Sequence, residues 1–175
     1  MKSIISGGGP LVCIELEVSD SWLGINGNSI QQELDLNASS DYEIACSIRD
    51  YIGKLSIRDR DVLILGDMPL ETLIWIPSNG LPMIVRIYYG DPDVDIIKLL
   101  QAAENLNFND PVEILLTEIK SSPIVVFDSA YPGFDTNVDK LSFELPPGKY
   151  RILTKQFYPD ERTSVLIHLF VRAQS

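Results

Sequence analysis

Short apolar stretches separated by turn signals recur along most of the chain. The turn signals combine proline, which presets φ, with glycine, which permits positive φ, and they fall at 66–69, 77–80, 131–133 and 146–148. Apolar stretches of this length between such turns are typical of β-strands. The strands predicted in this way span 11–18, 54–57, 62–65, 72–76, 83–89, 112–119, 124–127, 141–145, 150–158 and 164–172.

The last predicted strand is apolar on both of its faces. Its alternate residues are Val165, Ile167, Leu169 and Val171 on one face, and Leu166, His168 and Phe170 on the other. Because both faces have to be buried, we place this strand at the centre of a sheet. Together with the number of strands, this predicts a mostly β protein, a two-layer β-sandwich-like single domain over residues 1–175.

Two segments have the features of helices. The segment 42–51 follows Asp41, a candidate N-cap, and the segment 92–105 follows Asp91 and has proline at its first helical position. We therefore expect one or two short helices beside the strands. The helix over 92–105 is expected to pack against one sheet or to cap an end of the sandwich.

The composition is that of a globular protein, with 45% hydrophobic and 22% charged residues. The apolar N-terminal stretch is too short and broken for a signal peptide, and no apolar run approaches the roughly 20 residues that span a bilayer. Cys13 and Cys46 stand far apart, which predicts two reduced thiols and no disulfide framework. We expect a cytoplasmic protein.

The net charge of −11 is unevenly distributed. Residues 1–147 hold 9 Lys/Arg against 23 Asp/Glu, whereas residues 148–175 hold 5 against 2. An acidic surface repels nucleic-acid phosphates and attracts basic protein surfaces. The charge fits an acidic binding face for another protein, and it fits equally an acidic surface that only keeps the protein soluble.

The chain holds no credible catalytic or metal-binding set. Its only histidine, His168, lies in the apolar last strand, where a packed core histidine is the expected role. Asp91, Asp93 and Asp95 resemble the start of an EF-hand loop, but the glycine and the glutamate that such a loop requires are missing. We expect no enzymatic activity, no cofactor and no metal.

The order of several short motifs resembles the immunity protein 21 family of bacterial polymorphic-toxin systems, over nearly the whole chain. The motifs are GGGPL at 7–11, DY at 41–42, LGDMP at 65–69, FDSAYPG at 127–133, LPPGKYR at 145–151 and YPDERT at 158–163. The resemblance implies a non-catalytic antidote that binds a cognate toxin. The acidic balance fits a toxin that is a nuclease or another nucleic-acid-acting domain, because carboxylates can occupy the place of phosphates.

Exposed acids near turns and aromatic residues are the natural candidates for partner binding. They are Asp67, Glu71, Trp75, Asp128, Tyr131 and Asp135. For each of them a structural role in the core or in a turn is the competing interpretation. Two other functions stay open at this point: a small-molecule or carbohydrate-binding β-sandwich, and an enzyme that uses a facing pair of carboxylates.

Overall fold

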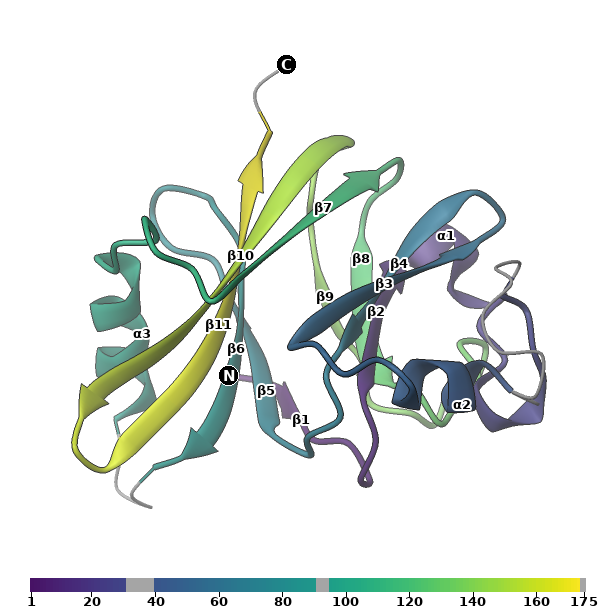
Figure 1. The fold of residues 1–175 in the computed structure, drawn as a ribbon, viewed down its shortest axis with the longest axis horizontal. Coiled ribbons are helices and arrows are strands. Elements are labelled where there is room, and N and C mark those ends of the chain that lie inside the picture. The colour runs from purple at the N-terminus through teal and green to yellow at the C-terminus, as the bar shows by residue number, and fades with distance from the viewer. Residues whose placement is uncertain (31–39, 91–94, 174–175) are drawn as a thin grey trace.

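The protein is described by a computed structural model that covers residues 1–30, 40–90 and 95–173. Two antiparallel sheets pack against each other (Figure 1). The six-stranded sheet has the order β1 (Ser3–Ile4), β5 (Glu71–Trp75), β6 (Met83–Tyr89), β11 (Thr163–Arg172), β10 (Gly148–Asp160) and β7 (Glu113–Ile119). The five-stranded sheet has the order β3 (Ile52–Ile57), β4 (Arg60–Leu65), β2 (Leu11–Glu15), β8 (Ile124–Asp128) and β9 (Leu141–Phe143).

The space between the sheets is filled by apolar side chains from both of them. Leu11 and Leu63 come from the five-stranded sheet, and Ile84 and Ile152 come from the six-stranded sheet. The rings of Phe143 and Phe170 meet edge to face across this space, with centroids 5.5 Å apart. Burial of these side chains is the main favourable term that holds the two sheets together.

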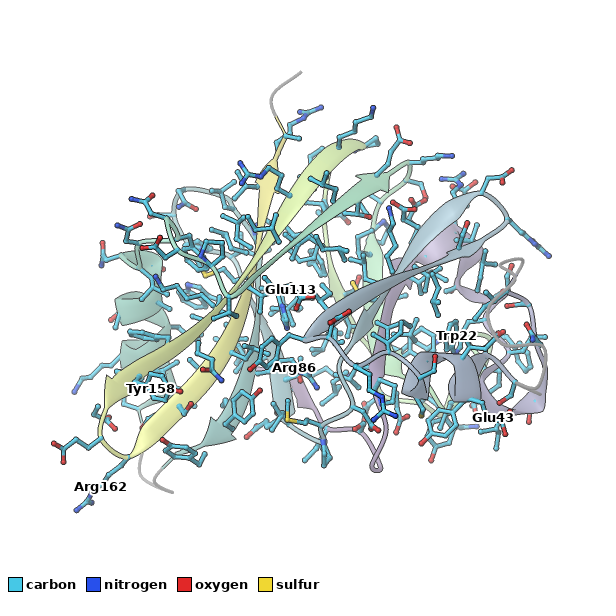
Figure 2. The ribbon with its side chains drawn as sticks, in the orientation of Figure 1. Trp22, Glu43, Arg86, Glu113, Tyr158 and Arg162 are labelled. Atoms are coloured by element: carbon cyan, nitrogen blue, oxygen red, sulfur yellow. The ribbon has the colours of Figure 1, made fainter. Side chains whose placement is uncertain are left out.

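Helices cover the outer faces of the two sheets (Figure 1). The helices α1 (Leu16–Ser19) and α2 (Asp41–Cys46) lie on the side of the five-stranded sheet, together with the 3₁₀ turn η1 (Gly24–Asn26). Trp22 fills this outer cluster beside α2 (Figure 2), and its indole N–H donates to the Ser129 carbonyl at 2.9 Å. The helix α3 (Ile96–Glu104) packs on the opposite side, against the six-stranded sheet.

The predicted mostly β, two-layer arrangement is confirmed. The strand predicted over 83–89 is β6 without change of bounds, and the last strand, β11, lies between β6 and β10. Three short α-helices occur in the described part of the chain, instead of one or two. Strand β1 was not predicted, because two residues are too few to show alternation.

The strand predicted over 11–18 is shorter than its apolar pattern. It ends at Glu15, where the chain turns into α1 and the Leu16 N–H donates to the Pro123 carbonyl. The apolar residue Val18 lies on α1, packed against the outer face of the five-stranded sheet. Both strands and short helices bury such residues, so the local pattern does not separate them.

The two helices predicted from the sequence correspond to α2 and α3, and each has an N-cap residue other than the predicted one. Ser40 caps α2 by accepting from the Glu43 N–H, whereas the Asp41 carboxylate accepts from the N–H groups of Leu23 and Ser29 and so fixes the preceding loop. Asp95 caps α3. The predicted cap Asp91 lies outside the described residues.

Glu15 is a fully buried carboxylate at the end of β2. Its oxygens accept from Arg60 Nη1 at 2.6 Å, the Lys120 N–H at 2.7 Å and the Ser121 hydroxyl at 2.6 Å. These donors come from β4 and from the connection between β7 and β8. A buried charge is tolerated only with such partners. Glu15 therefore links the end of β2 in the five-stranded sheet to the segment that leaves β7 of the six-stranded sheet.

The Glu15→Ala substitution should lower the free energy of unfolding by about 3 kcal/mol, because it leaves buried donors and the Arg60 charge without an acceptor. The matched control is Glu17→Ala, since Glu17 also contacts Arg60 but its side chain is 60% exposed. That change should cost less than about 0.5 kcal/mol. Urea denaturation measures both values, and equal losses for the two variants would contradict the role given to Glu15.

His168 lies on the inner face of the six-stranded sheet, fully buried, and its Nδ1 is 2.9 Å from the Thr154 hydroxyl. Burial, assisted by the charge of Arg86, lowers the pKa of His168 from 6.5 to about 3. Arg86 is itself buried and donates from Nη2 to the carbonyls of Gly66 and Met68. The predicted packed core histidine is therefore what the fold contains.

The depressed pKa of His168 predicts a loss of stability in acid. The neutral ring stabilises the folded state above the unfolded pKa near 6.5, and this contribution is lost as the pH falls toward 3. Between about pH 7 and pH 5 the wild type should lose roughly 2 kcal/mol more than His168→Gln, which has no titrating ring. Chemical denaturation at the two pH values tests this, and parallel losses in the two proteins would rule it out.

Candidate interaction face

Two pockets lined by carboxylates lie where loops from both sheets meet. The first, which we call the N-terminal pocket, has a volume of about 500 Å³ and is formed by the β1–β2 connection and by residues that follow β8. The second, the inter-sheet pocket, has a volume of about 660 Å³ and lies between the α2–β3 connection, the β4–β5 connection and the start of β7.

The N-terminal pocket gathers three of the candidate residues, Asp128, Tyr131 and Asp135, beside Asp139. Tyr131 is 48% exposed, and no hydrogen-bond partner for its hydroxyl is found among the described residues. Ser6 also lines this pocket, and its buried Oγ has no hydrogen-bond partner in the described chain. The pocket thus combines negative charge, an exposed aromatic ring and an unused hydroxyl.

Asp128 has a structural role within this pocket. It is 8% exposed, and its two oxygens accept from the Gly7 N–H at 2.7 Å and from the Ala130 N–H at 3.0 Å. These bonds fasten the β1–β2 connection to the end of β8. Gly133 then lets the following turn approach α1, because a Cβ there would lie 1.8 Å from the Ser19 carbonyl oxygen.

The inter-sheet pocket contains the candidate Asp67 together with Asp50 and Glu113. Glu113 accepts from the Ile52 N–H at 3.2 Å and so links β7 to β3. Partial burial and the charge of Asp50 raise the pKa of the Glu113 carboxyl, although the backbone bond to Ile52 opposes this. Arg49 is the one cation that lines this pocket among the described residues.

Tyr42 and Cys46 of α2 connect the two pockets electrostatically. A hydrogen bond with Cys46, partial burial and the negative charges of Asp67 and Asp128 raise the pKa of Tyr42 to about 12. Gly9 permits this position of the ring, since a Cβ there would lie 2.5 Å from the tyrosine oxygen. The two pockets, with Tyr42 and Cys46, are called the acidic face below.

The remaining two candidates lie outside both pockets. Glu71, at the start of β5, is exposed and accepts from the hydroxyl of Ser3, a residue of the N-terminal pocket, at 2.7 Å. Trp75, at the end of β5, packs in the cluster beneath α3 and donates from Nε1 to Glu104 at 2.9 Å. Trp75 is therefore occupied by a contact that positions α3.

Several residues of the acidic face were not identified from the sequence. Ser6, Asp50 and Glu113 lie far along the chain from the candidates whose pockets they share, and only folding brings them together. Asp139 is only four residues from the candidate Asp135, but the sequence analysis did not select it. Asp128 and Tyr131 could be selected together because both lie in the short motif FDSAYPG at 127–133. No motif of this kind marked Ser6, Asp50 or Glu113.

The described residues form no group of three or more His, Cys, Asp or Glu side chains arranged to hold a metal ion. Within the same ranges, none of the helices has the length and apolarity that crossing a membrane requires. Fold and pockets define a β-sandwich protein with a carboxylate-lined face.

Comparison with known families identifies the class to which this sandwich belongs. The model of the immunity protein 21 family matches residues 2–163, so the chain belongs to that family. Proteins of this family are not catalytic, and membership implies neutralisation of a cognate toxin. No curated protein and no solved structure matches the chain.

The geometry of the N-terminal pocket predicts that Asp128 contributes to stability. Asp128→Ala should lower the free energy of unfolding by about 2 kcal/mol, because two backbone N–H groups lose their acceptor. Asp139→Ala is the control, since an exposed ion pair with Lys2 is the one interaction found for the Asp139 side chain among the described residues, and its effect should stay below about 0.5 kcal/mol. Thermal or urea unfolding gives both values. An Asp128→Ala protein with the same free energy of unfolding as the wild type would refute the stabilising role of Asp128.

Proposed function

We propose that this immunity protein neutralises its toxin by covering a basic surface of the toxin with the acidic face. The observation that supports this most is the convergence of Asp128, Tyr131 and Asp135 in one pocket, with Asp139 and the unused Ser6 hydroxyl beside them. Family membership implies that the partner is a toxin protein. The negative charge of the acidic face favours a positively charged surface on that toxin.

The chemistry of the face suits a lysine or arginine side chain of the toxin. Asp135 and Asp139 offer carboxylate oxygens at the pocket, and Tyr131 offers an exposed ring against which the stem or head of a cation can pack. Aromatic residues that are partly buried before binding are frequent anchors of protein interfaces. The apolar side chains of Ile5 and Phe134, both exposed, extend the contact area around them.

A basic toxin surface is typical of proteins that bind nucleic acid. We therefore propose that the toxin is a nuclease or another nucleic-acid-acting domain, and that the carboxylates of the acidic face occupy the place of its phosphate ligands. The encounter would take place in the cytoplasm of the cell that makes both proteins. Asp67 and Glu71 would add long-range attraction at the edge of the interface.

The test begins with the toxin domain encoded beside this gene, expressed with and without the immunity protein. A stable complex that restores growth is the expected result. Because opposite charges attract, the Kd should rise by at least about ten-fold between low salt and roughly 0.3 M salt. Failure of the pair to associate and to restore growth would refute neutralisation of this toxin, and a Kd insensitive to salt would refute the acidic contact.

Variants of the N-terminal pocket locate the contact. The double change Asp135→Asn with Asp139→Asn, and separately Tyr131→Ala, should each raise the Kd by about ten-fold or more. Glu161→Gln is the matched control, because Glu161 is an exposed acid in the turn between β10 and β11, away from both pockets. Isothermal titration calorimetry measures all three. Wild-type affinity in the pocket variants would place the toxin on another surface.

A further inference from the structure

Two apolar side chains of β7 are exposed on the outer side of the six-stranded sheet. Ile114 and Leu116 are alternate residues of the strand, with exposed fractions of 47% and 62%. Alternate residues of a strand share one face, so these two side chains form one line. We call this line, together with Lys149 and Arg151 of β10, the β7 strip.

The strip is exposed because α3 covers a different part of the sheet. Helix α3 packs over side chains of β5, β6, β11 and β10, including Val85, Val165 and Leu153, but not over the exposed side chains of β7. Strand β7 is the edge strand beyond β10, and no helix is drawn over it in Figure 1. An exposed row of large apolar residues on a folded surface is a feature of interaction sites.

The apolar row is bordered by cations. In the register between β7 and β10, Leu116 lies opposite Arg151, and Glu118 lies opposite Lys149. Both Arg151 and Lys149 are exposed, and neither side chain makes an ion pair or a side-chain hydrogen bond with the described residues. Arg151 and Lys149 outnumber Glu118, the carboxylate that the register places beside them, so this part of a chain with a net charge of −11 carries a small excess of positive charge.

A pocket of about 370 Å³ opens at one end of the strip. Leu116 and Glu118 line it from β7 and Lys149 lines it from β10, while Lys54 of β3 and Asp61 of β4 line it as an ion pair. The pocket has room for an apolar side chain against Leu116, next to Lys149.

Backbone pairing along this part of the β7 edge is obstructed. The Leu116 carbonyl accepts from Lys54 Nζ at 3.1 Å, and the Glu118 N–H donates to Asp61 at 2.8 Å. A partner that added a strand here would have to displace both bonds. Docking on the strip therefore proceeds through side chains on its face.

We propose that the β7 strip is a docking site for an acidic protein segment that carries apolar side chains. The apolar groups of the segment pack on Ile114 and Leu116, and its carboxylates pair with Arg151 and Lys149. Charge disfavours a second copy of this chain, because a symmetric contact would bring together four cations, Arg151 and Lys149 of both copies, against two Glu118 carboxylates. It also decides against an anionic membrane, which repels the acidic remainder of the protein.

A peptide pair tests this site without the toxin, so the result does not depend on the proposed function. One labelled peptide of about twelve residues alternates leucine and glutamate, and the other alternates leucine and the uncharged residue serine, so that the acidic face attracts neither. Fluorescence anisotropy should show binding of the glutamate peptide at least about ten-fold tighter than that of the serine peptide. Equal binding of the two peptides, or no binding of the glutamate peptide, would overturn the proposal.

Substitutions then locate the peptide on the strip. Leu116→Glu and Arg151→Glu should each weaken binding of the glutamate peptide by about ten-fold. Ile25→Glu, at an apolar residue that is 63% exposed on η1, and Arg58→Glu, in the turn between β3 and β4, are the matched controls and should leave binding unchanged. Equal weakening in the controls would show unspecific attraction and overturn the assignment.

Two further measurements distinguish the other occupants. Sedimentation equilibrium should show the same oligomeric state for wild type and Leu116→Glu, and a dimer that Leu116→Glu dissociates would assign the strip to self-association instead. Flotation with vesicles of phosphatidylcholine and about one quarter phosphatidylglycerol should leave the protein unbound. Vesicle binding that depends on Leu116 would assign the strip to a membrane and overturn the proposal.

Discussion

The pairing of β2 with β8 at the centre of the five-stranded sheet is the constraint on which both the fold and the acidic face depend. Its register places Leu11 opposite Asp128 and Glu15 opposite Ile124, so a buried carboxylate stands at each end of the ladder. Glu15 accepts hydrogen bonds from β4 and from the chain after β7, and Asp128 accepts one from the β1–β2 connection. Buried carboxylates need all of their partners, so the ladder and both ends form one cooperative unit.

This arrangement explains why the acidic face can hold so many carboxylates close together. Two backbone N–H groups donate to the Asp128 carboxylate and offset the cost of burying it. Its negative charge still acts on Tyr42. The exposed acids of the pockets keep contact with water, which reduces their mutual repulsion. In the proposed complex, a basic partner would replace part of that water with opposite charge.

The sequence predicts the sandwich well where turns and alternation agree, as at β6, whose bounds are those of the pattern. It fails where a buried polar contact decides the outcome: β2 stops at Glu15, and Asp41 holds a loop instead of capping α2. For the site, Asp128, Tyr131 and Asp135 are neighbours in the chain and could be proposed together. Glu113 and Asp50 reach Asp67 only through tertiary pairing, which no local pattern encodes.

Strand β7 shows how one element separates two surfaces of different character. Its odd residues face the five-stranded sheet, where Glu113 lines the inter-sheet pocket, and its even residues, Ile114 and Leu116, face outward onto the strip. Because the side-chain period of a strand is two, a shift of one residue would turn Ile114 and Leu116 toward the five-stranded sheet and would expose the packed Thr117 and Ile119. The hydrogen bond from the Ile52 N–H to the Glu113 carboxylate and the hydrogen bond from the Glu118 backbone N–H to the Asp61 carboxylate both oppose such a shift. The contacts that fix the register of β7 therefore also fix which charge each surface presents.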